Sequence, residues 1–193
     1  MSKTLLDQLA RKHNTDKKIP DGRPSCVKSP GLGYSKFYSK ELKNKKIKTM
    51  IEIGVLFGNS ITMWDEYFGG RCKIYGIDKT PKPFAGKNLE SDHVHIKIGN
   101  QGDRNFLEQT FSQHRYELII DDGSHRYNDQ MASILQLFPY LTSGGLYVVE
   151  DLHISPAFLR LLKNPHEFPG YISSKIKGDV RIYEDKIAFI EKE

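Results

Sequence analysis

The segment TMIEIGVLFGNS, residues 49–60, joins an apolar, strand-like run to the start of a helical pattern through two glycines. Gly54 and Gly58 can adopt backbone angles that are closed to other residues, and without a Cβ they let a ligand approach the main chain. Their G-x-x-x-G spacing differs from the G-x-G-x-x-G of dinucleotide-binding enzymes, whose second glycine makes room for a pyrophosphate. The segment therefore predicts a strand–turn–helix unit with no implied pyrophosphate.

Strand-like and helix-like runs alternate along the rest of the chain. The runs are TMIEIGV (49–55), ITMWDEYFGG (61–70), KIYGID (73–78), VHIKIG (94–99), NFLEQTF (105–111), YELIID (116–121), DQMASILQLFPYL (129–141) and LYVVED (146–151). This alternation is typical of βαβ units in a parallel sheet that is buried on both faces. VRIYEDKIAFIEK (180–192) predicts an antiparallel edge hairpin around Glu184 and Asp185. The expected fold is α/β, a Rossmann-like, doubly wound, mostly parallel sheet with this C-terminal hairpin.

The remaining segments are predicted from composition and helical period. Leu5, Leu6 and Leu9 predict a helix over 3–13, and 34–42 predicts a second one. Residues 14–35 are rich in Pro and Gly, so we expect a loop that covers a site. SPAFLRLLKN (155–164) predicts a helix with Ser155 as its cap and Pro156 in its first turn.

The composition describes one folded domain. With 193 residues and 38% hydrophobic content, the chain can bury one core, so we expect a single domain over 1–193, with 1–45 as N-terminal helices and lid segment. The net charge of +5 is concentrated in KELKNKKIKTM (40–50), which favours a solvated face over a nucleic-acid patch. Cys26 and Cys72 have neither disulfide nor zinc spacing, which fits a reducing cytoplasm. No run reaches the roughly 20 apolar residues of a membrane span, and the N-terminus is not a signal peptide.

Two acidic residues indicate a nucleoside that carries an amino acid. Asp78 ends the second strand 20 residues after Gly58, where a carboxylate reaches ribose hydroxyls in this topology. Glu52 lies within a run committed to a buried strand, so its charge needs a partner such as an ammonium or backbone donors. S-adenosylmethionine has both parts. The alternative is that the glycines are ordinary strand-to-helix turns and Asp78 is a turn former.

Acidic residues at two further strand ends indicate a metal. IIDDGSH (119–125) and YVVED (147–151) end neighbouring strands of the expected sheet, which brings Asp122, Glu150 and Asp151 together. Clustered carboxylates repel one another unless a cation neutralises them, and an all-oxygen set suits Mg²⁺.

His125 stands three residues after Asp122 and could accept the proton of a hydroxyl. The alternative is a polar turn in which Asp122 and Ser124 cap the helix that starts near Arg126. His153 is a competing base or ligand. We expect the other histidines to face solvent: His93, His95, His114 and His166.

Seven motifs in order resemble a known family. They are NTDK (14–17), EIGVLFGNSITMW (52–64), IYGID (74–78), GNQGDRNFL (99–107), IIDDGSH (119–125), GGLYVVEDLH (144–153) and the closing IAFIEK hairpin. From about residue 12 onward the chain resembles class I S-adenosylmethionine-dependent methyltransferases, specifically the Mg-dependent macrolide-sugar O-methyltransferases and their cephalosporin-hydroxylase-like relatives. The family's aromatic, substrate-facing segment after the fifth strand is here the plain ISPAFLRLLKN.

The resemblance implies a role for each matching residue. Asp122, Glu150 and Asp151 fall on the family's metal ligands, and His125 falls on its general base. Gln101 and Asp103 match the adenine side, and Thr15 and Lys17 match the lid. The whole set assigned to the donor pocket is Thr15, Lys17, Glu52, Gly54, Gly58, Ser60, Asp78, Gln101, Asp103 and Asp121.

The predicted function is S-adenosylmethionine-dependent O-methylation of a small molecule or sugar, with Mg²⁺ assistance and a histidine base. The first alternative is a nucleic-acid (RNA) methyltransferase, favoured by the pI of 9.0, although an acidic triad repels phosphates unless metal is bound. The second is an S-adenosylmethionine-binding module without turnover. The glycine spacing gives an NAD-dependent oxidoreductase the least support.

Overall fold

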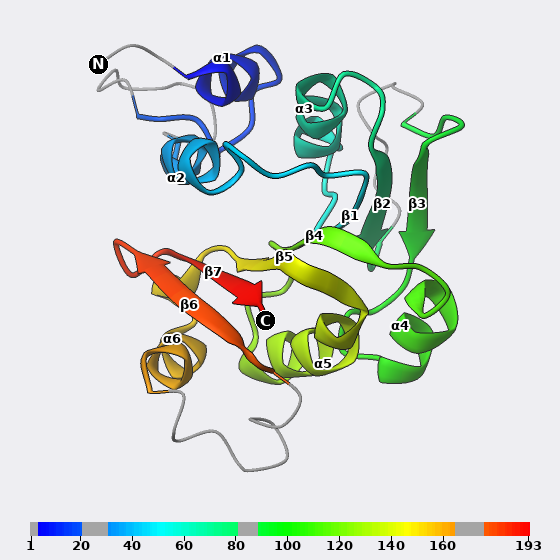
Figure 1. The fold of residues 1–193 in the computed structure, drawn as a ribbon, viewed down its shortest axis with the longest axis vertical. Coiled ribbons are helices and arrows are strands. Elements are labelled where there is room, and N and C mark those ends of the chain that lie inside the picture. Colours follow the sequence, from blue (N-terminus) through cyan, green and yellow to red (C-terminus); the bar gives the residue numbers. More distant parts are fainter. Residues whose placement is uncertain (1–3, 21–30, 81–88, 165–175) are drawn as a thin grey trace.

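A seven-stranded sheet with helices on both faces forms the centre of the structure (Figure 1). The computed structural model describes residues 4–20, 31–80, 89–164 and 176–193. The strand order is β3-β2-β1-β4-β5-β7-β6. All pairs from β3 to β5 are parallel, and β7 pairs antiparallel with both β5 and β6. The predicted α/β fold, with its mostly parallel sheet and C-terminal hairpin, is confirmed.

The strands and helices lie close to the segments expected from the sequence. The strands are β1 (Thr49–Ile53), β2 (Lys73–Asp78), β3 (Val94–Ile98), β4 (Tyr116–Asp121), β5 (Leu141–Val149), β6 (Gly178–Tyr183) and β7 (Ile187–Lys192). The α-helices are α1 (Leu5–Lys12), α2 (Tyr34–Glu41), α3 (Asn59–Tyr67), α4 (Arg104–Phe111), α5 (Tyr127–Leu137) and α6 (Pro156–Lys163). Two short 3₁₀ turns are η1 (Phe138–Tyr140) and η2 (Leu152–Ile154).

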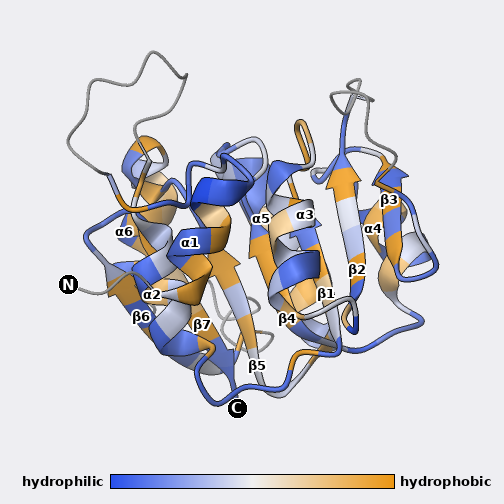
Figure 2. Ribbon diagram, turned by 90° about the horizontal axis from the view of Figure 1, so that it is seen from above, coloured by the Kyte–Doolittle hydropathy of each residue, from blue (hydrophilic) through white to orange (hydrophobic). Residues whose placement is uncertain are grey.

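Two hydrophobic cores lie on opposite faces of the sheet. Successive strand residues point to opposite faces, so Met50 of β1 joins the core under α1, α2 and α3, while Ile51 joins the core over α4, α5 and α6. Figure 2 shows hydrophobic residues along the strands and on the helices that pack against them. Trp64 and Tyr38 meet edge to face at 5.0 Å in the first core. The N-terminal helices therefore share a core with the sheet.

Two local expectations differ from the structure. Leu5 is 58% exposed, because the buried face of α1 is centred on Leu6, Leu9 and Ala10, at i, i+3 and i+4. Ser155 occupies the N-cap position of α6 without a side-chain cap bond. Its hydroxyl instead donates to Gln130 Oε1 at 2.6 Å, because a buried acceptor competes with the helix end for it.

The C-terminal hairpin follows its turn chemistry. Glu184 and Asp185 both have left-handed backbone angles, φ 52° and 53°, which match the right-handed twist of the flanking strands. Cys72 is free and buried, whereas Cys26 and His166 lie outside the described residues. Within the described ranges, no helix is long and apolar enough to cross a membrane. The expectation of one domain over 1–193 stays a prediction.

The carboxyl ends of the parallel strands are fastened to one another. Gly54 N donates to Ile77 O at 2.8 Å, and Asp122 N donates to Ile53 O at 2.9 Å. Gly54 has φ 94°, and a Cβ there would lie 2.0 Å from the carbonyl oxygen of Asp122. The glycine is therefore required because two backbones approach each other directly at this edge.

We expect Gly54→Ala to lower the free energy of unfolding by more than about 3 kcal/mol, since a left-handed alanine is strained and its Cβ must also push Asp122 away. Gly144→Ala is the matched control: φ there is 71°, and the nearest atom to an added Cβ is Glu191 Oε1 at 4.0 Å. In Gly144→Ala, the free energy of unfolding should fall only by the cost of a left-handed alanine, roughly 1–2 kcal/mol. Chemical denaturation measures both, and equal losses would contradict the close-approach argument.

Candidate functional site

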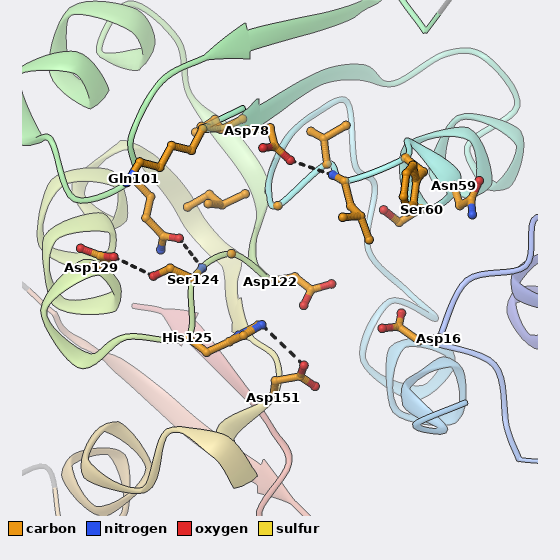
Figure 3. A pocket seen from close by; sticks show the side chains of 18 of the residues that line it. Asp16, Asn59, Ser60, Asp78, Gln101, Asp122, Ser124, His125, Asp129 and Asp151 are labelled. Carbon is orange, nitrogen blue, oxygen red and sulfur yellow. Dashed lines mark hydrogen bonds and ion pairs between the residues drawn. The ribbon is translucent and has the colours of Figure 1, made fainter. Parts of the chain in front are cut away.

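An open pocket of about 1040 Å³ lies at the carboxyl ends of β1, β2 and β4 (Figure 3). This is the edge at which open parallel sheets bind ligands. Of the residues predicted from the sequence, those that line the pocket are Thr15, Gly54, Ser60, Asp78, Gln101, Asp122, His125 and Asp151. Those that do not line it are Lys17, Glu52, Gly58, Asp103, Asp121 and Glu150.

Asp78 is held rigidly at one end of the pocket. Its Oδ2 accepts from Leu56 N at 2.8 Å, and its Oδ1 accepts from Thr80 N at 3.0 Å. Each carboxylate oxygen can accept a further bond. The Asp78 side chain is therefore fixed to the glycine turn, and each of its oxygens can still accept a hydrogen bond from a hydroxyl in the pocket. A residue that binds ribose hydroxyls is expected to have this geometry.

Behind the opposite wall, Asp121 anchors a network of side chains. Its Oδ1 accepts from Gln101 Nε2 at 3.1 Å, and its Oδ2 accepts from Ser133 Oγ at 2.5 Å. Gln101 Oε1 in turn accepts from Ser124 N at 2.7 Å. Burial raises the pKa of Asp121 above its usual value, against these bonds. Asp121 thus holds Gln101, which lines the pocket, rather than facing the pocket itself.

Two more acids near this wall have different positions. Asp103 caps α4 by accepting from Phe106 N at 3.1 Å and is exposed. Asp129 lines the pocket and accepts from Ser124 Oγ at 2.7 Å. Sequence reasoning did not identify Asp129, which appears only as an acidic residue in the first turn of α5. Asp129 faces the pocket because the loop that carries Ser124 lies against the first turn of α5, where the two side chains bond.

At the other end of the pocket, Asp122, His125 and Asp151 lie together. Each offers one ligand atom, and these atoms all lie within 4.8 Å of one another. His125 Nε2 is 3.6 Å from Asp151 Oδ2, and the three side chains converge in Figure 3. The predicted convergence of Asp122 and Asp151 across two strand ends is therefore present, with His125 beside them.

Backbone strain is concentrated around this pocket. Within the described ranges six residues other than glycine have left-handed backbone angles, and four of them line the pocket: Asn14, Leu56, His125 and Asp151. Such angles cost of order 1–3 kcal/mol each and persist where the surroundings fix them, as in binding sites. The buried Nδ1 of His125 also has no hydrogen-bond partner among the described residues.

Lys17 lies fully buried behind the acidic residues. Its Nζ is 2.9 Å from Asp122 Oδ2, 2.9 Å from Glu150 Oε2 and 3.6 Å from Glu52 Oε1. Burial opposes its charge, but the carboxylates outweigh burial and hold the pKa of Lys17 well above its usual value. Lys17 is the ammonium partner that a buried Glu52 requires, and it comes from the chain itself.

One ammonium does not balance these carboxylates. Burial raises the pKa of Glu52 to about 7 and that of Asp122 to about 6, despite the nearby Lys17. Burial likewise raises the pKa of Glu150 well above its usual value. With Asp151 alongside, the cluster has four carboxyl groups for one ammonium, and the raised pKa values show that protons, or a further cation, stabilise it.

Two tyrosines of α2 also bind the acidic residues. Tyr34 OH donates to Asp151 Oδ1 at 2.6 Å, and Tyr38 OH donates to Glu150 Oε1 at 2.5 Å. Both oxygens of Glu150 therefore have partners, since Lys17 holds the other. The role of Glu150 as a metal ligand stays a prediction. No sequence signal links these tyrosines to strand ends more than 100 residues away.

His153, the competing base, is exposed and does not line the pocket. His93, just before β3, bonds Asp65 at 2.8 Å, and His95 in β3 lies against Tyr75 at 5.4 Å between ring centroids; neither lines the pocket. His125 is thus the histidine that the structure places in the pocket, among those it describes.

Comparison with known proteins shows the family to which the chain belongs. A family model described as a methyltransferase domain matches residues 51–152, which span the glycine turn, Asp78 and the acidic strand ends. The chain belongs to this methyltransferase family.

Two curated relatives are O-methyltransferases by their names, and one of these names includes a rhamnosyl group. The mycinamicin VI 2''-O-methyltransferase of Micromonospora griseorubida is 29% identical over 189 residues, covering 79% of this chain and 45% of that protein. The 8-demethyl-8-(2-methoxy-alpha-L-rhamnosyl)-tetracenomycin-C 3'-O-methyltransferase of Streptomyces olivaceus is 38% identical over 96 residues, covering 49% of this chain and 23% of that protein. The chain thus spans less than half the length of these relatives.

A solved structure shares the fold over nearly the whole chain. The MycE methyltransferase from the mycinamycin biosynthetic pathway, in complex with Mg, SAH and mycinamycin VI, has a TM-score of 0.75 and 25% sequence identity. The match covers 98% of this chain and 54% of that one. The expected class I methyltransferase fold is confirmed.

The buried Glu52 makes stability depend on pH. Its pKa is raised from 4.5 to about 7 in the folded protein, so the folded state binds more protons than the unfolded state between these values. The free energy of unfolding therefore falls as pH rises from about 4.5 to 7. Relative to Glu52→Gln, the wild type should lose up to about 3 kcal/mol over this range, at 1.36 kcal/mol per pKa unit. Urea unfolding at several pH values measures the difference. A constant difference would show that Glu52 is already ionised at pH 5.

Proposed function

We propose that this chain transfers a methyl group from S-adenosylmethionine to a hydroxyl of a small-molecule acceptor, a sugar or glycoside, with Mg²⁺ assistance. The observation that carries the proposal is that one pocket contains both groups of residues. The glycine turn and Asp78 lie in one part of it, and Asp122, His125 and Asp151 lie together in another. Family membership supports the methyl transfer, and the rhamnosyl group in the name of the Streptomyces olivaceus relative supports the sugar acceptor.

The donor is proposed to lie along the ends of β1 and β2. Gly54 lets it approach the backbone, Asp78 accepts the ribose hydroxyls, and Gln101 with Asp129 borders the adenine. Thr15 and Ser60 complete this wall. Asp121, Asp103, Gly58 and Glu52, predicted as donor contacts, are proposed to act from behind by supporting the pocket wall.

The reaction is a displacement at the methyl carbon. The acceptor oxygen forms a bond to the methyl carbon while the carbon–sulfur bond breaks, and its electron pair stays on sulfur as S-adenosylhomocysteine forms. The hydroxyl proton passes to His125 Nε2, which faces the pocket beside Asp151 Oδ2. Imidazole suits this role because its ordinary pKa lies near neutrality. Asp151 then stabilises the positive charge on the ring.

The carboxylates in the pocket fit a hard divalent ion. Asp122 and Asp151 supply oxygen ligands, and the open pocket leaves room for the waters that Mg²⁺ keeps. When bound, such an ion lowers the pKa of a coordinated hydroxyl by many units. Glu150 could join the ligands only by giving up Lys17 or Tyr38. We therefore propose that it holds Lys17, which in turn orients Asp122.

Methyl transfer can be tested with a panel of sugars and glycosides and methyl-labelled donor. The wild type should transfer label in the presence of Mg²⁺. His125→Ala should lose a factor of about 10² or more in rate because it lacks the base, while its donor affinity by calorimetry stays within about twofold. Donor binding without transfer to any acceptor by the wild type would instead support the alternative of a binding module.

The metal ligands can be tested with paramagnetic Mn²⁺ as the probe. Asp151→Asn should weaken Mn²⁺ binding at least tenfold, because a ligand loses its charge in the pocket. Glu150→Gln is the matched control, a neighbouring carboxylate with both oxygens already occupied, and should change affinity by no more than about threefold. Equal losses of Mn²⁺ affinity in the two variants would show that Glu150 is also a metal ligand.

The alternative of an RNA methyltransferase rests on the net charge of +5. A gel shift with RNA that weakens steeply with salt would support it.

We also propose, from the composition alone, a single domain over 1–193 and a cytoplasmic location.

A further inference from the structure

Asp122 and Asp151 each have one carboxylate oxygen bound by the N-terminal segment and one directed elsewhere. Lys17 Nζ holds Oδ2 of Asp122, and Tyr34 OH holds Oδ1 of Asp151. The other oxygen of Asp151, Oδ2, faces His125 Nε2 at 3.6 Å. Within the described part of the chain, Oδ1 of Asp122 accepts no hydrogen bond that would compete with an ion. The second oxygen of each carboxylate is therefore available in the pocket.

Tyr34 makes two contacts with the same aspartate. Besides donating to Oδ1, its hydroxyl oxygen accepts from Asp151 N at 3.3 Å. Tyr34 lies at the start of α2 and is fully buried. Asp151 itself has a left-handed backbone angle, φ 55°, a conformation that needs external support. One phenol group thus fixes both the backbone and the side chain of this residue.

Tyr38 provides a comparison one helical turn later. It is equally buried and donates to Glu150, the residue just before Asp151. Glu150 does not line the pocket, and Lys17 holds its other oxygen. The two tyrosines therefore make similar bonds to adjacent acidic residues, of which Asp151 lies in the pocket and Glu150 lies behind it.

We propose that Tyr34 is a positioning residue for the divalent ion: its hydroxyl orients Asp151 so that Oδ2 is presented to the ion beside Asp122. This inference rests on the proposed function. Groups that hydrogen-bond to metal ligands typically change metal affinity by 10–100-fold when they are removed. The effect of Tyr34 should therefore appear in metal binding itself, whatever the acceptor is.

The test measures Mn²⁺ binding to the full chain by electron paramagnetic resonance, without donor or acceptor. Tyr34→Phe should raise the dissociation constant about tenfold, whereas Tyr38→Phe should change it by less than twofold. Melting temperatures of both variants without metal report the purely structural part, which should be larger for Tyr34→Phe, because the Tyr34 hydroxyl bonds both Asp151 and Lys186 O while that of Tyr38 bonds Glu150 alone. Donor affinity should be unchanged in both.

A double-mutant cycle separates positioning from general loosening. Because Tyr34 acts through Asp151, adding Tyr34→Phe to Asp151→Asn should weaken Mn²⁺ binding no further. Additive effects, a Tyr34→Phe affinity equal to that of the wild type, or equal losses in Tyr34→Phe and Tyr38→Phe would overturn the inference while leaving the metal site intact. A wild type that binds donor but no Mn²⁺ would overturn both the metal-assisted function and this inference.

Discussion

The ammonium of Lys17 is the interaction on which the site depends. It lies among Glu52, Asp122 and Glu150, each from a different strand end, with two contacts at 2.9 Å and one at 3.6 Å. Burying a carboxylate without a partner costs several kcal/mol, so three of them could not gather at one edge without an internal cation. Lys17 reduces the charge but does not cancel it. Of the three carboxylates, Asp122 also lines the pocket, where a divalent ion and a base are proposed to act.

The N-terminal segment has two tasks at once. Residues Asn14, Thr15 and Asp16 line the pocket, and the next residue is the buried ammonium. Since α1 and α2 also share a core with α3 and the sheet, the wall of the pocket and the neutralisation of its acidic side are parts of one structure. Within NTDK, the first three residues therefore line the pocket, and the side chain of Lys17 points into the protein.

Periodicity and turn chemistry predicted the sheet, because alternation, glycine turns and the Glu184–Asp185 turn are local properties of the chain. The same logic placed Asp122 and Asp151 together, since parallel strands end at one edge. The partners of those acids could not be predicted. Lys17 meets Asp122 across 105 positions and Glu150 across 133, and no local pattern distinguishes a lysine that will be buried from one that will be solvated. Whether an acid faces the pocket or lies behind it, as Asp121 does, is decided by side-chain partners from other elements.

The C-terminal hairpin extends the support of the site to the opposite end of the chain. Tyr183 stacks on Phe37 of α2 at 4.6 Å and its hydroxyl bonds Glu41, while Lys36 pairs with Glu184. The backbone of Lys186 accepts from Leu152 N at 2.9 Å, next to Asp151. The helix that carries both tyrosines therefore packs against residues of β6, β7 and the turn between them. Because α2 holds Asp151 and Glu150 through these two tyrosines, the position of both acids depends on a hairpin that lies more than 25 residues further along the chain.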